Sequence, residues 1–271
     1  MKHTNYVLDY SEPILYLAIH NGHNLSVNIK NKINITDADR LREEDPYTDR
    51  FISDKKNHII QLTSRFECDL NRTRFKSIYQ NPEDCWGMQI YHADHMICKD
   101  EIAASTKIYD SFYGEIIKTV ENFLERYEKL VIWDIHSYNH RRNGQNMPFD
   151  SDEENPEIII GTTNYNYMSL EWKELIDTIQ NRLETQKLHQ TKYENRPLQT
   201  PTLDVRQNVK FSGGHLSQFL NFHYGERVCC IPLEFKKIWM NEWTGQVDEE
   251  CLADLKRIFD NTAKEVLNLI S

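Results

Sequence analysis

The sequence has few of the features that mark repetitive, secreted or membrane-spanning chains. Its 271 residues include only nine glycines and eight prolines, which form no low-complexity tract. None of the six cysteines stands in a Cys-x-x-Cys pair, and their spacing is unlike that of a secreted disulfide scaffold, so we expect free thiols. No run of about 18 apolar residues occurs, and residues 1–13 lack the apolar stretch of a signal peptide. We therefore expect a cytoplasmic protein without a membrane-spanning helix.

Positive charge is also scarce, because 32 Lys and Arg residues face 42 Asp and Glu residues and leave a formal net charge of −10. Nucleic acids and anionic membranes are usually bound by a basic surface. The composition therefore argues against both as main partners. An anionic small molecule would have to be bound by a few local arginines.

Apolar runs alternate with amphipathic stretches along the chain. Runs typical of buried strands lie at residues 14–19, 58–66, 130–135, 158–160 and 228–233. Helical spacing of apolar residues occurs at residues 102–127, 167–183, 215–223 and 248–270. Such alternation predicts an α/β fold with a mixed, mostly parallel central sheet and helices on both faces. We expect a single domain over residues 1–271, with residues 188–201 forming a surface excursion or an edge hairpin.

Three of the strand-like runs end in a residue that can bind a metal or transfer a proton. These residues are His20, His136 and Glu234. The carboxyl ends of parallel strands meet at one edge of a sheet, so residues far apart in sequence can meet there. Two imidazoles and a carboxylate are sufficient to begin a hydrolytic zinc site, and an open water position suits zinc better than other divalent metals.

Each of these residues also has a structural interpretation. A histidine at a strand end is more often a hydrogen-bonded structural residue than a ligand. For His136 the odds change, because strand alternation places Asp134 on the same side, where its carboxylate can orient the ring. A lone buried glutamate is rare, so Glu234 requires either a function or a partner such as Lys236.

A third metal ligand is expected from the acidic segment at residues 43–49. This segment alone would be read as a solvated loop. Beside two candidate histidines, Asp45 becomes a plausible ligand, and His23 and Asp49 are the competing choices.

Arginine and glycine motifs predict an anion-binding surface. Arg72 follows Asn71, and an arginine fork with a neighbouring amide is suited to a carboxylate. Equally, Arg65 and Arg72 could pair with nearby acidic residues such as Asp69. Residues 211–214, which contain two glycines before a predicted helix, form a loop whose backbone amides can meet an anion.

Taken in order, these strings resemble the N-formylglutamate amidohydrolase family over about residues 14–245. The strings are His20-x-Gly22, Glu44-Asp45-Pro46-Tyr47-Thr48, Asp69-Leu70-Asn71-Arg72, Asp134-x-His136-Ser137, Gly161-Thr162-Thr163-Asn164, Phe211-Ser212-Gly213-Gly214 and Leu233-Glu234. Two of them, Asp-Leu-Asn-Arg and Asp-x-His, also look like elements of aspartoacylase and, more distantly, of the zinc carboxypeptidases. All of these proteins share a phosphorylase/hydrolase-like α/β fold.

The resemblance implies one catalytic zinc ion and a small N-formyl or N-acyl amino acid as substrate. Its implied metal ligands are His20, Asp45 and His136, and its implied general base is Glu234. Arg65 would stabilise the oxyanion, and the substrate would be bound by Asn71, Arg72, Asn164, Gly213 and Gly214. One departure is that aspartoacylase-like enzymes have a glutamate three residues after the first histidine, where this chain has His23.

Other functions remain open at this stage. The same site would serve a zinc carboxypeptidase-like hydrolase of another carboxylate-bearing amide. A non-catalytic carboxylate-binding protein on the same scaffold is a second class, and an interaction domain with structural histidines is a third. The oligomeric state is not readable from the residues.

Overall fold

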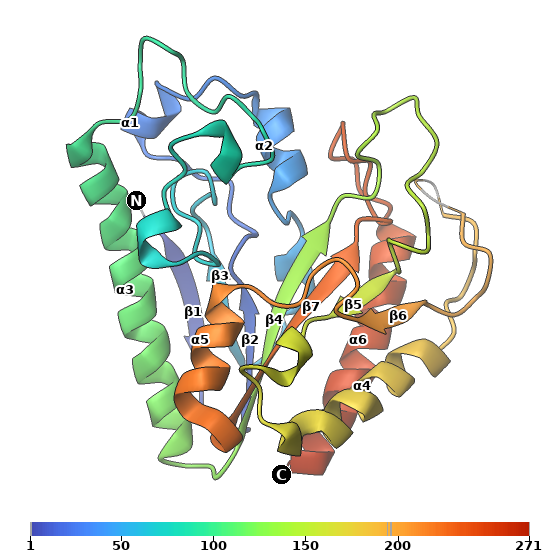
Figure 1. Cartoon of the computed structure of the whole chain (residues 1–271). Helices are drawn as coiled ribbons and strands as arrows, with labels where there is room; N and C mark the ends of the chain where they lie inside the picture. The colour runs from blue at the N-terminus through green and yellow to red at the C-terminus, as the bar shows by residue number, and fades with distance from the viewer. Residues whose placement is uncertain (1, 194, 196, 271) are drawn as a thin grey trace.

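The computed structural model describes residues 2–193, 195 and 197–270, whose strands form one seven-stranded sheet in the order β1-β3-β2-β4-β7-β5-β6 (Figure 1). The strands are β1 Thr4–Leu8, β2 Ile14–Ala18, β3 Asn57–Gln61, β4 Leu130–Tyr138, β5 Ile158–Ile160, β6 Val205–Gln207 and β7 Val228–Lys236. The central strands β3, β2, β4 and β7 are mutually parallel. On the two flanks, β1 is antiparallel to β3, and β5 is antiparallel to β7. The predicted mixed, mostly parallel sheet is confirmed.

Helices cover both faces of the sheet, as predicted. Figure 1 shows α3 (Lys99–Leu124) and α5 (His215–Tyr224) on one side and α4 (Lys173–Thr185) and α6 (Glu249–Ile270) on the other. Two short helices, α1 (Val27–Lys30) and α2 (Asp37–Glu43), lie above the sheet in that view. The short 3-10 turns are η1 Thr48–Phe51, η2 Arg74–Lys76, η3 Pro82–Asp84, η4 Thr163–Tyr165, η5 Leu170–Trp172 and η6 Gly225–Arg227.

The central strands are buried on both faces because their side chains alternate between two apolar cores. In β4, Val131, Trp133 and Ile135 join the core that includes side chains of α4 and α6. Leu130 and Ile132 join the core that includes side chains of α3 and α5. This arrangement explains why the central strands appear in the sequence as continuous apolar runs.

The structure differs from the sequence-based expectation mainly at the sheet edges and in the loops. Strands β1 and β6 were not predicted, because each is short and only partly buried. The strand predicted at residues 58–66 ends at Gln61, since Ser64 redirects the backbone by accepting hydrogen bonds from the N–H groups of Phe66 and Glu67. Helix α2 was not predicted from the sequence, and the Thr36 hydroxyl caps it by accepting from Asp39 N at 3.1 Å.

Residues 188–201 resemble the edge hairpin that the sequence left open. Antiparallel bridges join Lys187 to Thr202 and Lys192 to Pro197. Residues 194 and 196 of this segment lie outside the described residues.

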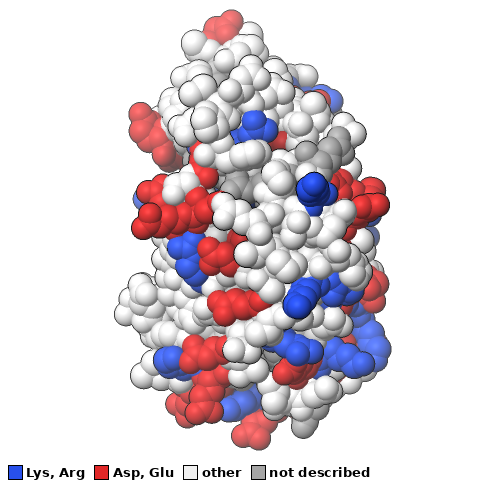
Figure 2. Space-filling model, turned by 90° about the vertical axis from the view of Figure 1, so that its right-hand side faces the viewer, with Lys and Arg blue, Asp and Glu red and all other residues white. Residues whose placement is uncertain are grey.

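Along the described part of the chain, no helix combines the length and apolarity needed to cross a bilayer. Figure 2 shows acidic and basic side chains interspersed over the face that carries α4 and α6, without a continuous basic patch on that face.

The cysteine thiols provide a test of this packing. All six cysteines are free, and Cys98 alone is exposed whereas the other five are buried. Burial raises the pKa of Cys85 to about 11, and it raises the pKa of Cys68 and Cys229 further. With Ellman's reagent, one thiol should react rapidly in the folded protein and six after denaturation. Cys98→Ser should remove the rapid phase, and two or more rapid thiols in the wild-type protein would contradict the fold described here.

Candidate active site

The parallel register brings three of the predicted site residues to one edge of the sheet. In the β4–β7 pair, His136 lies directly opposite Glu234. In the β2–β4 pair, Leu17 lies opposite Asp134, so His20, three residues further along, reaches the same edge as His136. Adjacent parallel strands therefore place two imidazoles and a carboxylate side by side.

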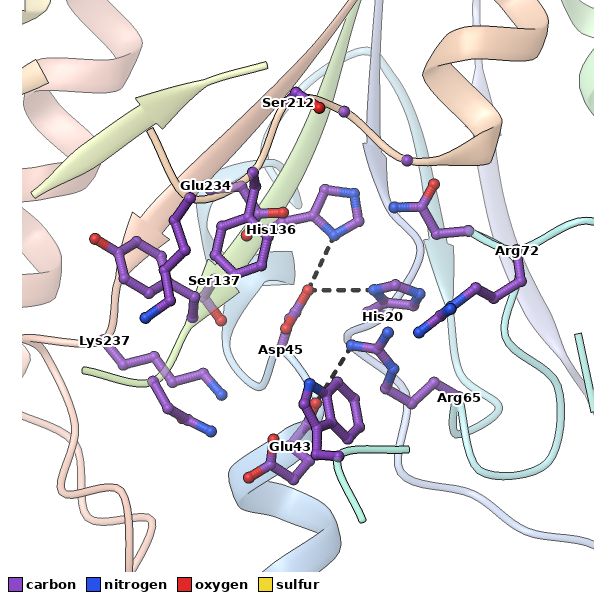
Figure 3. A pocket seen from close by; sticks show the side chains of 18 of the residues that line it. His20, Glu43, Asp45, Arg65, Arg72, His136, Ser137, Ser212, Glu234 and Lys237 are labelled. Carbon is purple, nitrogen blue, oxygen red and sulfur yellow. Dashed lines mark hydrogen bonds and ion pairs between the residues drawn. The ribbon is translucent and has the colours of Figure 1, made fainter. Parts of the chain in front are cut away.

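The acidic partner, Asp45, comes from the segment that follows helix α2. Its backbone N–H donates to the carbonyl oxygen of His20 at 3.0 Å, which ties the two residues together. Its Oδ2 atom lies 3.0 Å from His136 Nδ1 and 3.4 Å from His20 Nδ1 (Figure 3). All three side chains are buried, and their ligand atoms lie within 4.8 Å of one another.

The second ring nitrogen of each histidine faces a different buried carboxylate. His20 Nε2 lies 2.7 Å from Asp69 Oδ1, and His136 Nε2 lies 3.0 Å from Asp134 Oδ2. The predicted pairing of Asp134 with His136 is confirmed. Asp69 was not expected to orient His20, because the two residues are 49 positions apart and no local pattern links them.

This arrangement fits a divalent metal ion. A hydrogen-bonded carboxylate at His20 Nε2 and a carboxylate close to His136 Nε2 leave the Nδ1 atoms directed at the shared position, which is the usual support for ligating histidines. His20 Nδ1 is buried without a hydrogen-bond partner. The carboxylates of Asp45, Asp69 and Asp134 outnumber the guanidinium of Arg65, so the cluster is negatively charged when both imidazoles are neutral.

The two competing ligands lie elsewhere. His23 Nδ1 is 2.5 Å from Glu44 Oε2, and its Nε2 contacts Arg40 Nη2 at 2.9 Å. Asp49 lies in η1, and its backbone N–H donates to Asn21 Oδ1. Among the described residues, the group with metal-ligand geometry consists of His20, Asp45 and His136.

The charges in this cluster shift one another's pKa values. Burial raises the pKa of Asp45, but its hydrogen bond with His136 and the nearby His20 ring outweigh burial and hold that pKa well below its usual range. Burial lowers the pKa of His136, but the adjacent carboxylate of Asp134 outweighs burial and raises it. The cluster therefore attracts a cation strongly, and a bound metal would displace the imidazole proton.

Glu234 lines the cavity, as Asp45 does, but it is only partly buried, whereas Asp45, Asp69 and Asp134 are buried. Desolvation raises its pKa to about 7, although the neighbouring His136 acts in the opposite direction. Its predicted alternative partner, Lys236, is directed elsewhere, with Nζ 2.8 Å from Glu157 and 3.2 Å from Asp152. A carboxyl group with this pKa exchanges protons readily near neutral pH.

The two arginines of the predicted substrate clamp have different environments. Arg65 forms an ion pair with Asp69 at 2.8 Å, so the expected structural pairing is present, yet its side chain also lines the cavity. The side chain of Arg72 is 43 % exposed, and its closest contact with Asp69 is 3.7 Å, which leaves its fork largely available. Asn71 caps helix α5, because its Oδ1 accepts from Leu216 N at 3.1 Å.

The glycine loop at residues 211–214 forms one wall of the cavity. A Cβ atom on Gly214 would lie 2.3 Å from the side-chain amide of Asn71, so only glycine allows this contact. Gly213 has φ of 113°, which favours glycine, and a Cβ on Gly161 would approach the Gly213 nitrogen to 2.8 Å. The Gly161 motif therefore supports this wall through close backbone contact.

Asn164 is separated from the other predicted site residues. It lies in η4 in a left-handed conformation and accepts a hydrogen bond from Asn208 Nδ2 at 3.2 Å. It does not belong to the described residues that line the cavity. Its role in substrate binding stays a prediction.

The site opens into a cavity of about 320 Å³, near the lower end of the roughly 300–1,000 Å³ common for ligand pockets. Several lining residues were not singled out from the sequence, since nothing in their local pattern marks them: Trp86, Asn139, Arg142, Lys210 and Lys237. Trp86 packs against the Arg65 guanidinium, whose central carbon lies 4.9 Å from the ring centroid. Arg142 is neutralised by Glu43 at 2.7 Å.

The fold of this chain is similar to those of two proteins with solved structures. The chain matches the structure of an N-formylglutamate amidohydrolase from Ralstonia eutropha JMP134 with a TM-score of 0.74 and 16% identity, covering 100% of this chain and 98% of the other. A gene product from Agrobacterium tumefaciens matches with a TM-score of 0.64 and 16% identity, covering 98% and 96% of the two chains. At this identity the likeness shows the fold, and no curated protein matches the chain.

A sequence model of a protein family assigns the chain to a family as well as to a fold. The model of N-formylglutamate amidohydrolases matches residues 12–239, which include both strand-end histidines, Asp45 and Glu234. The match covers most of the chain and agrees with the resemblance seen in its motifs. The chain therefore belongs to the N-formylglutamate amidohydrolase family.

Proposed function

We propose that residues 1–271 form a single catalytic domain, a zinc-dependent amidohydrolase that cleaves the amide bond of an N-formyl or other N-acyl amino acid. The observation that carries the proposal is the convergence of His20 Nδ1 and His136 Nδ1 on the carboxylate of Asp45, with Glu234 adjacent to His136. Family membership supports the reaction class.

The zinc ion would be held by His20, His136 and Asp45. When bound, it would polarise the scissile carbonyl group and lower the pKa of a water molecule. The two buried aspartates, Asp69 and Asp134, would keep the imidazoles oriented and neutral at their ligating nitrogen.

Glu234 is suited to be the general base and acid. Its carboxylate would accept a proton from the attacking water and then deliver that proton to the departing amine. Two features support this assignment, its position beside His136 and its pKa of about 7.

The substrate carboxylate would be bound by Arg72, with Asn71 and the loop at residues 211–214 completing that side of the cavity. Arg65 would stabilise the developing oxyanion, with the carboxylate of Asp69 offsetting part of its positive potential. A cavity of about 320 Å³ suits a compact acyl amino acid. The alternative function is carboxypeptidase-like hydrolysis of another small amide that bears a carboxylate, since the same cavity would accept it.

Metal binding is the first prediction. Protein purified without added metal should contain about one zinc ion per chain by elemental mass spectrometry. His136→Ala should lose the metal because it removes one of the ligands.

The matched control is His58→Gln. His58 is also buried, but its ring bonds to the Lys55 carbonyl oxygen, so this variant should keep the metal. A wild-type protein that takes up no metal even when zinc is offered would refute the hydrolase. That result would favour a carboxylate-binding protein.

The second prediction concerns Glu234→Gln. Turnover of N-formyl amino acids should fall by about 10²–10⁴-fold, because the amide cannot accept the proton, while zinc content stays at the wild-type level. Glu226→Gln, at an exposed position in η6, should leave kcat unchanged.

The role of Glu234 as a base also predicts the direction in which activity changes with pH. Only the deprotonated form of Glu234 is a base, and its pKa of about 7 would be lowered by a bound dication. In the wild-type enzyme, kcat/KM should therefore fall as the pH drops through a value at or below about 7. Near-normal kcat in Glu234→Gln would exclude the general-base role.

The third prediction concerns Arg72→Met. Loss of the charged fork should raise KM for N-acyl amino acids while zinc binding is retained, because the guanidinium recognises a carboxylate away from the metal. Arg74→Met is the control, since Arg74 forms an exposed ion pair with Asp110 outside the cavity. Equal KM values for the two variants would show that Arg72 does not bind the substrate.

A further inference from the structure

Lys237 joins the segments that carry three site residues. It follows strand β7 three residues after Glu234, and its backbone N–H donates to the Tyr138 carbonyl oxygen at the end of β4 at 3.0 Å. Its side chain is buried and lines the cavity, and Figure 3 shows it directed toward Glu43 and Asp45. A lysine in this position is costly to desolvate and needs specific partners.

Those partners are two backbone carbonyl groups at the end of helix α2. Lys237 Nζ donates to the carbonyl oxygens of Arg42 and Glu44, each at 2.6 Å. The last carbonyl groups of a helix have no partner within the helix, and a cation near that end is favourable. The lysine therefore supplies the C-terminal hydrogen bonds of α2.

Asp45 follows the second of these carbonyl groups directly. Its backbone N–H bonds to the His20 carbonyl oxygen at 3.0 Å, so the segment is held on one side by β2 and on the other by Lys237. The Glu44 side chain is fixed as well, because it accepts hydrogen bonds from Ser64 and from Arg40. These contacts leave Asp45 little freedom to move away from the two histidines.

Acidic residues compensate for part of the cost of burying Lys237. Burial lowers the pKa of its ammonium group, and the carboxylates of Asp45, Glu43 and Glu242 act in the opposite direction. Removing the ammonium group would leave two carbonyl groups without their donor and would remove a counter-charge to the acidic residues.

We infer that Lys237 is a positioning residue that holds the Asp45 segment in the geometry needed to bind the metal. The inference rests on the metal site of the proposed function, but it does not depend on which amide is hydrolysed.

Lys236 provides a matched comparison within the same strand. Its side chain is also fully buried, yet its Nζ forms ion pairs with Glu157 and Asp152. Lys236 is not among the described residues that line the cavity. Substitution of either lysine removes a buried ammonium group, and only one of the two substitutions alters the support of Asp45.

The experiment measures zinc affinity of the full chain by competition with a chelator. Lys237→Met should weaken zinc binding by about 10–100-fold, the range typical for loss of a residue that supports a metal ligand. Lys236→Met should bind zinc as the wild-type protein does, even if its melting temperature falls as far as that of Lys237→Met. Lys237→Gln keeps an N–H donor group without the charge and should give an intermediate affinity, and it serves as the test if the methionine variant does not fold.

Three results would overturn the inference. Wild-type affinity in Lys237→Met or Lys237→Gln would show that Asp45 needs no support from this side chain. Equal losses in the Lys236 and Lys237 variants would assign the effect to general destabilisation. Absence of zinc binding in the wild-type protein would remove the metal site itself, whereas zinc binding without amide hydrolysis would leave the inference standing and count against the reaction alone.

Discussion

One carboxylate oxygen, Oδ2 of Asp45, lies between the Nδ1 atoms of two strand-end histidines, and the other groups of the site are arranged around it. The position follows from two constraints. Parallel pairing of β2, β4 and β7 brings His20, His136 and Glu234 to one edge of the sheet. The hydrogen bond from Asp45 N to the His20 carbonyl oxygen then brings in the acidic segment from outside the sheet.

The electrostatics of the cluster follow from its burial. Asp45, Asp69 and Asp134 are almost inaccessible to solvent, where a carboxylate is stable only with charged or hydrogen-bonding partners. The imidazoles and Arg65 supply part of that compensation. Glu234 has fewer such contacts, so desolvation raises its pKa, whereas the partners of Asp45 and Asp69 hold the pKa values of those two residues low. Asp45 is thereby suited to metal ligation and Glu234 to proton transfer, although both are carboxyl groups of the same site.

The walls of the cavity depend on close contacts that lie outside the candidate metal site of His20, Asp45 and His136. Asn71 illustrates this, because it was expected to bind substrate and also caps helix α5 through Leu216 N. Gly214 must lack a side chain for Asn71 to reach that position. Asn71, a residue expected to bind the ligand, therefore also shapes the backbone, and a substitution of Asn71 or Gly214 would alter this wall of the cavity.

The α/β fold class, the central strands and the two histidines and the glutamate at their ends could all be predicted from the residues alone. Burial on both faces produces continuous apolar runs, and a polar residue at the end of such a run is conspicuous. It also indicated the pairing of Asp134 with His136, since strand alternation is a local rule. The other contacts of the site depend on how distant segments pack together. Asp45, rather than Asp49 or His23, meets the histidines because the turn after α2 and its contact with His20 select it. Asp69 and Lys237 reach the site across 49 and 193 positions of sequence, from His20 and Glu44 respectively, and no local pattern encodes contacts of that range.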